Sequence, residues 1–173
     1  MSAQFHTNKI TNPTPKANKN TETMEDKTFR CRIELIEAGM SKYGLKKFNT
    51  HYLPKLIEDG EHIEAVVYGR YAEGPGFLSW TDRMIVATDR RVISVNHKPG
   101  YTDFDEFTYD VINGVETTAA GLFTGISLTT KIHELRVRFV NKKCAKKFVH
   151  FIEKRRIEYY EDTKRININS FGL

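Results

Sequence analysis

The sequence predicts a mainly β fold (α+β by content): a small antiparallel barrel or sandwich of seven strands, capped by a C-terminal helix and preceded by an N-terminal helical extension. Two observations predict it. Between residues 61 and 140, short apolar runs with strand periodicity recur about every ten residues, and turn residues separate them. On both sides of this region, apolar residues recur at helical spacing instead.

The chain begins with a polar segment and a helical extension. Residues 1–28 are rich in Asn, Thr, Lys and Pro, and predict a disordered tail. The next segment, residues 29–59, predicts two helices. The first presents an apolar face of Phe29, Ile33, Ile36 and Met40, which we expect to be buried, and ends near Lys42 or Gly44. The second is short, has Pro54 in its first turn and stops at Gly60.

The strands follow from Glu61 onward. The apolar runs that predict them span residues 63–67, 83–87, 91–95, 104–109, 113–118, 126–130 and 135–139. Thr88-Asp89-Arg90 lies between two runs and predicts a tight hairpin, with the Asp89 side chain bonding the turn backbone. Lys98-Pro99-Gly100 predicts another turn.

A single amphipathic helix closes the barrel. Asn141 is the expected N-cap, and Ala145, Phe148, Val149 and Ile152 form the inward face. The periodicity fades after residue 157. We therefore divide the chain into a tail (1–28), a helical lead-in (29–59), the β domain (60–157) and a C-terminal tail (158–173).

Composition and charge exclude several classes of protein. Hydrophobic residues make up 39% of the chain, which excludes collagen-like and fully disordered proteins. No apolar run approaches the roughly 20 residues that cross a bilayer, and no secretory signal is visible. Cys31 and Cys144 are interpreted as reduced thiols, so we expect a cytoplasmic protein.

The net charge of +5 is unevenly distributed along the chain. Residues 61–140 carry eight Lys/Arg and eleven Asp/Glu, whereas residues 141–173 carry nine and four. The surplus therefore belongs to the last helix and its tail, and the barrel has no basic groove. This distribution disfavours a nucleic-acid-binding protein.

The order of elements and several local motifs resemble the bacterial PH-like family called YokE-like. The motifs are EHIEAVVYG (61–69), ATDRRVISV (87–95), FTYDVI (107–112), GLFTGISL (121–128) and CAKKFVHFI (144–152). The resemblance covers residues 56 to about 155 and implies a PH-like barrel, but little about function, since fold does not imply function. The loop between Tyr71 and Asp82 departs from the pattern because it is longer and more apolar.

No pattern in the sequence carries catalytic chemistry. Metal-binding His-Glu-x-x-His, the Gly-x-Ser-x-Gly elbow and the phosphate-binding loop are all missing. Cys144 lies among lysines, which would lower a thiol pKa, but a small residue at a helix start explains it better. We assign no catalytic, cofactor or metal residues and predict that the protein is not an enzyme.

Three groups of residues are candidates for partner or membrane contact. Phe77, Leu78 and Trp80 form an apolar loop tip, or fold back over the barrel mouth. Arg90 and Arg91 face an acidic partner, or serve turn solubility and edge-strand protection. The lysines Lys143, Lys147 and Lys154 attract anionic lipid, or form a solvated helix face.

These candidates support two hypotheses. The first is a non-catalytic interaction module that binds a protein or peptide along a strand edge, or between the last helix and the barrel. The alternative is a peripheral membrane adaptor that uses the basic helix and the Phe77–Trp80 loop. Specific phosphoinositide recognition is disfavoured because the loop between the first two strands has no Lys; Arg70 and Arg83 flank it, offset by Glu73 and Asp82.

Overall fold

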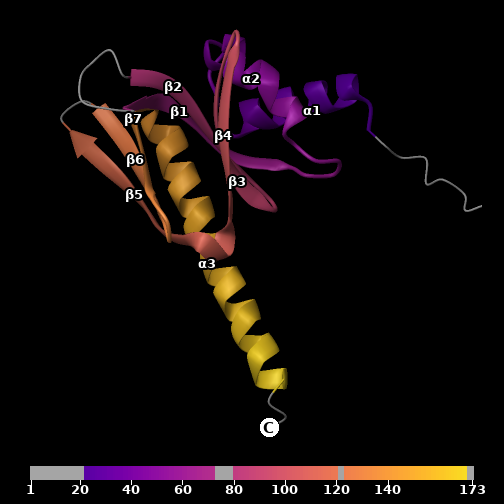
Figure 1. Ribbon diagram of the computed structural model, residues 1–173, viewed down its shortest axis with the longest axis vertical. Helices are drawn as coiled ribbons and strands as arrows, with labels where there is room; N and C mark the ends of the chain where they lie inside the picture. Colours follow the sequence, from indigo (N-terminus) through magenta and orange to yellow (C-terminus); the bar gives the residue numbers. More distant parts are fainter. Residues whose placement is uncertain (1–21, 73–79, 121–122, 171–173) are drawn as a thin grey trace, which may run out of the picture.

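The structure is a computed structural model that describes residues 22–72, 80–120 and 123–170 (Figure 1). The lead-in holds α1 (Met24–Glu37), η1 (Gly44–Lys46), α2 (Phe48–Tyr52) and η2 (Leu53–Lys55). The strands are β1 (Ile63–Ala72), β2 (Trp80–Thr88), β3 (Arg91–Lys98), β4 (Tyr101–Thr108), β5 (Ile112–Ala120), β6 (Phe123–Thr130) and β7 (Glu134–Val140). A short turn, η4 (Tyr109–Val111), links β4 to β5, and α3 (Lys142–Ser170) ends the fold.

All strand pairs are antiparallel, and the sheet order is β4-β3-β2-β1-β7-β6-β5. The seven predicted strands are therefore confirmed, and β4 and β5 are the free edges. Within residues 22–72 and 123–170, β1 pairs with β7 only at Arg70↔Arg138 and Tyr71↔Val137. Gly69 allows this approach, because a Cβ on it would lie 2.3 Å from the carbonyl oxygen of Arg138.

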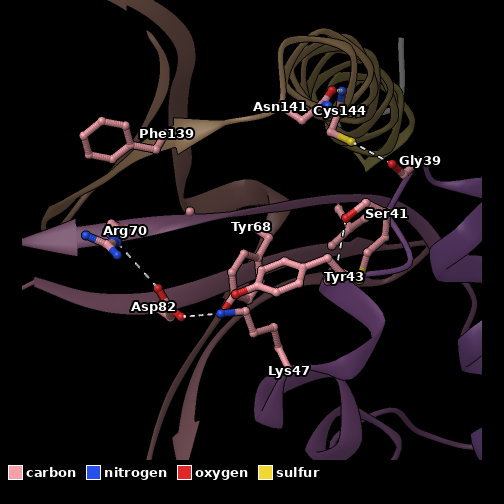
Figure 2. A pocket seen from close by; sticks show the side chains of 14 residues that line it. Gly39, Ser41, Tyr43, Lys47, Tyr68, Arg70, Asp82, Phe139, Asn141 and Cys144 are labelled. Atoms are coloured by element: carbon pink, nitrogen blue, oxygen red, sulfur yellow. Dashed lines mark hydrogen bonds and ion pairs between the residues drawn. The ribbon is translucent and has the colours of Figure 1, made fainter.

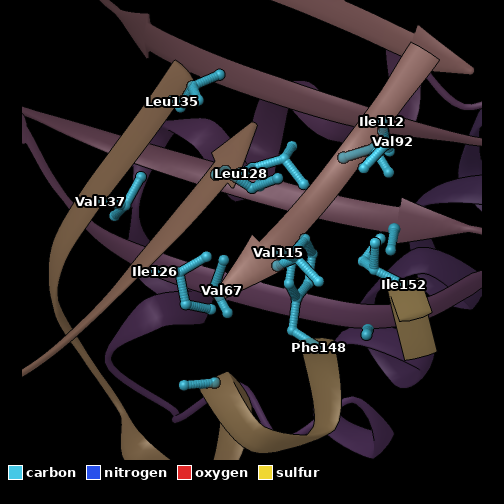
Figure 3. Close-up of a cluster of buried hydrophobic side chains, with 14 of the residues drawn as sticks. Val67, Val92, Ile112, Val115, Ile126, Leu128, Leu135, Val137, Phe148 and Ile152 are labelled. Carbon is cyan, nitrogen blue, oxygen red and sulfur yellow. The ribbon is translucent and has the colours of Figure 1, made fainter. Parts of the chain in front are cut away.

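The inner face of the sheet and α3 enclose the main core (Figure 3). Phe148 and Ile152 of α3 are fully buried against strand residues such as Val67, Ile126 and Leu128. The predicted N-cap is confirmed, since the Asn141 side chain accepts hydrogen bonds from the backbone N–H groups at 143 (2.9 Å) and 144 (3.3 Å). The helix thus plugs the open side of the barrel, as its apolar spacing predicts.

The lead-in helices build a second core on the outer face of β1–β3. Cys31, Leu35 and Leu53 are almost fully buried there. They pack against the outward strand side chains Ile63, Val66, Met84, Val86, Ile93 and Val95, each at most 6% exposed. β3 is consequently buried on both faces, which explains why Val92, Ile93 and Val95 are all apolar.

The prediction for the buried face of the first helix was wrong. Phe29, Ile33 and Ile36 are exposed, at 69%, 39% and 49%, and only Met40 of the predicted set is buried. The opposite face, with Cys31 and Leu35, meets the sheet instead. α1 carries apolar side chains on both faces, so the spacing of its apolar residues alone does not show which face meets the sheet.

Several predicted boundaries also differ from the structure. α1 begins at Met24, inside the predicted tail, and ends at Glu37, where Gly39 adopts a positive φ of 101°. The second helix was predicted to have Pro54 in its first turn and to stop at Gly60. The structure instead has the 3-10 turn η2 there, which contains Pro54 and ends at Lys55, and the helix α2 precedes it. α3 continues to Ser170, so the predicted tail from residue 158 is helical for most of its length, and it projects beyond the sheet (Figure 1).

Candidate functional site

Hydrogen bonds to other groups of this chain hold the β2–β3 hairpin in place. The Thr88 hydroxyl accepts hydrogen bonds from the backbone N–H groups of Arg90 (3.1 Å) and Arg91 (2.9 Å), which fixes the turn. The Asp89 carboxylate accepts from the backbone N–H of His62 at 2.9 Å. The predicted tight hairpin is confirmed, but the predicted bond of Asp89 to the turn backbone is wrong. The bonded N–H belongs to His62, just before β1, and the Thr88 hydroxyl bonds the turn instead.

Arg90 and Arg91 bind groups of this chain. Arg91 is 16% exposed and holds the fully buried carboxylate of Glu61 through two contacts of 3.0 Å. It also binds Glu106 at 2.7 Å, and Arg90 binds Glu58 at 3.0 Å. These bonds connect the lead-in and the segment before β1 to β3 and β4. Both arginines therefore bind groups of this chain, and we do not include them in a partner surface.

The Glu61 carboxylate stays ionised inside this network. Burial alone would raise its pKa, but hydrogen bonds from Arg91, the Glu58 backbone and Thr88 outweigh burial and hold the pKa below its ordinary value. The pKa of Arg91 is raised by the same bond to Glu61. The pair is therefore charged at neutral pH, and it holds the segment before β1 against β3.

The other candidate residues divide into two groups. The side chains of Phe77, Leu78 and Trp80 lie outside the residues that the structure describes. Lys143 and Lys147 are exposed near the start of α3, and the Lys147 amine donates to the Glu37 carbonyl oxygen at 3.0 Å. Lys154 is exposed one turn before Glu158, with 3.8 Å between their charged groups.

Neither thiol is activated. Burial raises the pKa of Cys31 to about 11 and raises that of Cys144, whose sulfur lies 3.1 Å from the Gly39 carbonyl oxygen. Within the described ranges, no group of three or more His, Cys, Asp or Glu side chains is arranged to hold a metal ion. No helix there is long and apolar enough to cross a membrane.

The barrel mouth is acidic. Arg83 is almost fully buried at the start of β2, and two carboxylates of β4, Asp103 and Asp105, bind its guanidinium, Asp105 at 3.0 Å. The Tyr71 ring lies 4.7 Å from the guanidinium carbon of Arg83. Two carboxylates against one guanidinium leave a negative charge, so the described part of the mouth does not favour a phosphorylated headgroup.

A groove of about 890 Å³ runs between α3 and the η4–β5 segment. Exposed apolar side chains on its α3 side include Ile157 (60%) and Tyr160 (63%). Its charged lining comprises Asp110, Lys131, Glu153, Arg156, Glu161 and Lys164, three of each sign. The groove reaches β5 at its first residue, Ile112, and β5 is an edge strand of the sheet that the described residues form.

A smaller hollow of about 350 Å³, here called the junction hollow, lies where the lead-in meets β1, β7 and α3 (Figure 2). Lys47 and Tyr43 come from the lead-in, Tyr68 and Arg70 from β1, and Asp82 from β2. Phe139, Asn141 and Cys144 line the opposite wall.

An ion cluster organises the junction hollow. The Lys47 amine binds the Asp82 carboxylate at 3.1 Å, and Arg70 approaches the other carboxylate oxygen at 3.9 Å. Burial raises the pKa of the Tyr68 phenol, and its hydrogen bond to Asp82 raises it further, so this hydroxyl stays protonated. Phe139 has a φ of 61°, an uncommon conformation for a bulky residue, and its side chain is 45% exposed.

Sequence reasoning did not find the junction hollow. Its walls come from segments that are far apart in the chain, and the sequences of β1 and β7 do not predict the register in which the two strands pair. One signal was present: a glycine inside a strand, Gly69, marks a close backbone approach.

A family model described as a bacterial PH domain matches residues 57–154, more than half of the chain. This chain belongs to the bacterial PH domain family. The PH-like fold predicted from the sequence is confirmed, whereas the finer YokE-like assignment stays a prediction. The match begins after η2, so the helices of the lead-in lie outside the family domain.

Two solved structures are similar to this bacterial PH domain protein. The C-terminal domain of an unknown protein from Leishmania infantum is 12% identical, with a TM-score of 0.44, over 60% of this chain and 90% of that chain. A DUF1696 family protein with a pleckstrin-homology domain from Shewanella loihica is 19% identical, with a TM-score of 0.33, over 54% and 77%. No curated protein sequence matches the chain.

Proposed function

We propose that this PH-like protein is a non-catalytic, cytoplasmic interaction module that binds an extended peptide segment of a protein partner. The observation that carries the proposal is the groove between α3 and the η4–β5 segment, which reaches the edge strand β5 at its first residue, Ile112. A free edge offers backbone N–H and C=O groups to an added strand, and a neighbouring groove provides pockets for its side chains.

The composition of the groove supports a peptide ligand. Tyr159 and Tyr160 are 49% and 63% exposed, and Ile157 is 60% exposed. Tyrosine is enriched at protein interfaces because its ring is rigid and its hydroxyl tolerates water. The balanced charges of the lining favour an uncharged or mixed-charge segment over a strongly acidic or basic one.

Selection from a displayed peptide library tests this proposal. We expect peptides that bind the wild-type protein, and we expect Ile157→Asp or Tyr160→Asp to weaken their binding at least tenfold. Phe29→Asp is the matched control, because Phe29 is equally exposed (69%) but lies on α1. Binding that survives both groove substitutions, or a library that yields no ligand, would contradict a peptide groove.

The alternative function, a peripheral membrane adaptor, is supported by the exposed lysines on the outer face of α3, which include Lys143, Lys146 and Lys154. If these lysines bind lipid, sedimentation with vesicles will require anionic lipid, weaken with added salt and decline in Lys143→Glu/Lys146→Glu. Equal binding to neutral vesicles, or none at low salt, would count against this function.

A further inference from the structure

We propose that the C-terminal part of α3 pairs in antiparallel orientation with the same segment of a second copy of this chain. The segment carries four groove-lining residues at spacings of four, three and four, here called the α3 stripe: Glu153, Ile157, Tyr160 and Lys164. Residues at these spacings lie along one side of a helix, as the a and d positions of a coiled coil do. The Lys164 amine lies 4.6 Å from the centre of the Tyr160 ring, which shows that both side chains lie on this stripe.

The α3 stripe is exposed in this chain. Ile157 and Tyr160 are more than half exposed, whereas Phe148 and Ile152, nearer the start of the same helix, are fully buried. Figure 1 shows the end of α3 projecting beyond the strands, and none of the described elements closes the groove over the stripe. Because most of the stability of a helix in a protein comes from packing of its apolar side, this stripe fits a further packing element.

The order of its residues makes the α3 stripe complementary to itself when it is reversed. From Glu153 to Lys164 the stripe reads acid, apolar, apolar, base. In an antiparallel pair centred between residues 158 and 159, Ile157 meets Tyr160 of the second copy, and Glu153 meets Lys164 of the second copy. Two-fold symmetry makes each contact occur twice. A parallel pair would place like charges together at both ends of the stripe, so the charges select the antiparallel orientation.

A charged pair beside the stripe supports the same orientation. Lys154 and Glu161 are seven residues apart, so they lie on the same flank of α3. A two-fold antiparallel pair brings equal flanks together, which places Lys154 of one copy beside Glu161 of the other. Within its own chain, the Lys154 amine lies 3.8 Å from Glu158, and both side chains are exposed. This long contact leaves the amine able to bind a second carboxylate.

The pairing occupies the groove that was assigned above to a peptide. Because α3 projects beyond the sheet, the two PH-like domains lie at opposite ends of the helix pair (Figure 1). The second copy's helix then lies along the groove-lining stripe, so a second copy and a peptide exclude each other. This regulation of the groove rests on the proposed function, whereas the dimer itself does not. A peptide obtained from the library selection should therefore convert the dimer to the monomer.

Charge reversal tests the pairing, with the mass of the full chain measured by sedimentation velocity over a range of concentrations at low salt. We expect the wild type to form a dimer. Glu153→Lys places a lysine against Lys164 of the second copy at two contacts and should weaken the dimer at least tenfold. Glu153→Lys/Lys164→Glu restores opposite charges and should return the affinity close to that of the wild type. Asp162→Lys is the matched control that should leave the dimer unchanged, because Asp162 is exposed on the same helix, about 200° around it from Tyr160.

Three results would overturn the proposal. One is a wild-type chain that stays monomeric at every concentration. Another is a dimer that Glu153→Lys leaves intact, or that the double variant does not restore, because other surfaces or parallel helices would then hold it. The third is a dimer that is lost in Phe29→Asp, which would assign the contact to the exposed apolar face of α1. These mass measurements contain no peptide, so the dimer and the peptide groove can fail separately.

Discussion

A chain that starts at residue 57, where the family match begins, will not yield a stable monomer. Removing the lead-in exposes the second core, in which six strand side chains from Ile63 to Val95 are at most 6% exposed. At about 1.5–3 kcal/mol for each buried apolar side chain, the loss is on the order of 10 kcal/mol. That loss is comparable to the whole stability of a typical domain, about 5–15 kcal/mol.

Size-exclusion chromatography and thermal unfolding followed by circular dichroism measure this effect. We expect the truncated chain to aggregate, because an apolar sheet face of this size associates with other copies. A chain that starts at residue 22 is the control, since it keeps α1 and all of the second core. A monomeric truncated chain that melts within a few degrees of wild type would show that the outer face does not need the lead-in.

The seven strands were predicted well from the sequence because alternating apolar residues indicate a strand with one buried face. The lead-in was predicted as a separate segment, although Val92, Ile93 and Val95 place apolar side chains on both faces of β3, as expected for a strand covered on both faces. The choice between the two faces of α1 could not be made from the pattern. Its bulkier stripe, Phe29 to Ile36, faces solvent, and Leu35 faces the sheet.

The surface residues were harder to predict, because their roles depend on partners distant in the chain. Arg91 follows the hairpin turn and has the sequence context of an exposed residue, yet it binds Glu61, 30 residues earlier. The opposition of Arg70 and Arg138 depends on strand register, which needs the folded sheet. The exposed lysines of α3, by contrast, follow directly from helical spacing.

The largest effect of a single substitution is expected for Arg91→Ala. It leaves the fully buried carboxylate of Glu61 without its guanidinium partner. Breaking a buried ion pair from one side costs about 3–5 kcal/mol. The neighbouring Arg90 contacts Glu58 at the surface, with side chains 46% and 58% exposed, so Arg90→Ala should cost less than about 1 kcal/mol. Urea denaturation at pH 7 compares the two variants.

The pH dependence separates this mechanism from a general loss of packing. The folded-state pKa of Glu61 is lowered, so in the wild type its ionised form stabilises the fold above the unfolded-state pKa of about 4.3. This stabilisation is lost as the pH falls through the folded-state value. In Arg91→Ala the buried carboxylate has a raised pKa, so its penalty is present at pH 7 and fades on acidification. The stability difference between wild type and Arg91→Ala should therefore shrink from pH 7 to pH 4, whereas a difference that stays constant over this range would mean that the arginine acts through packing alone.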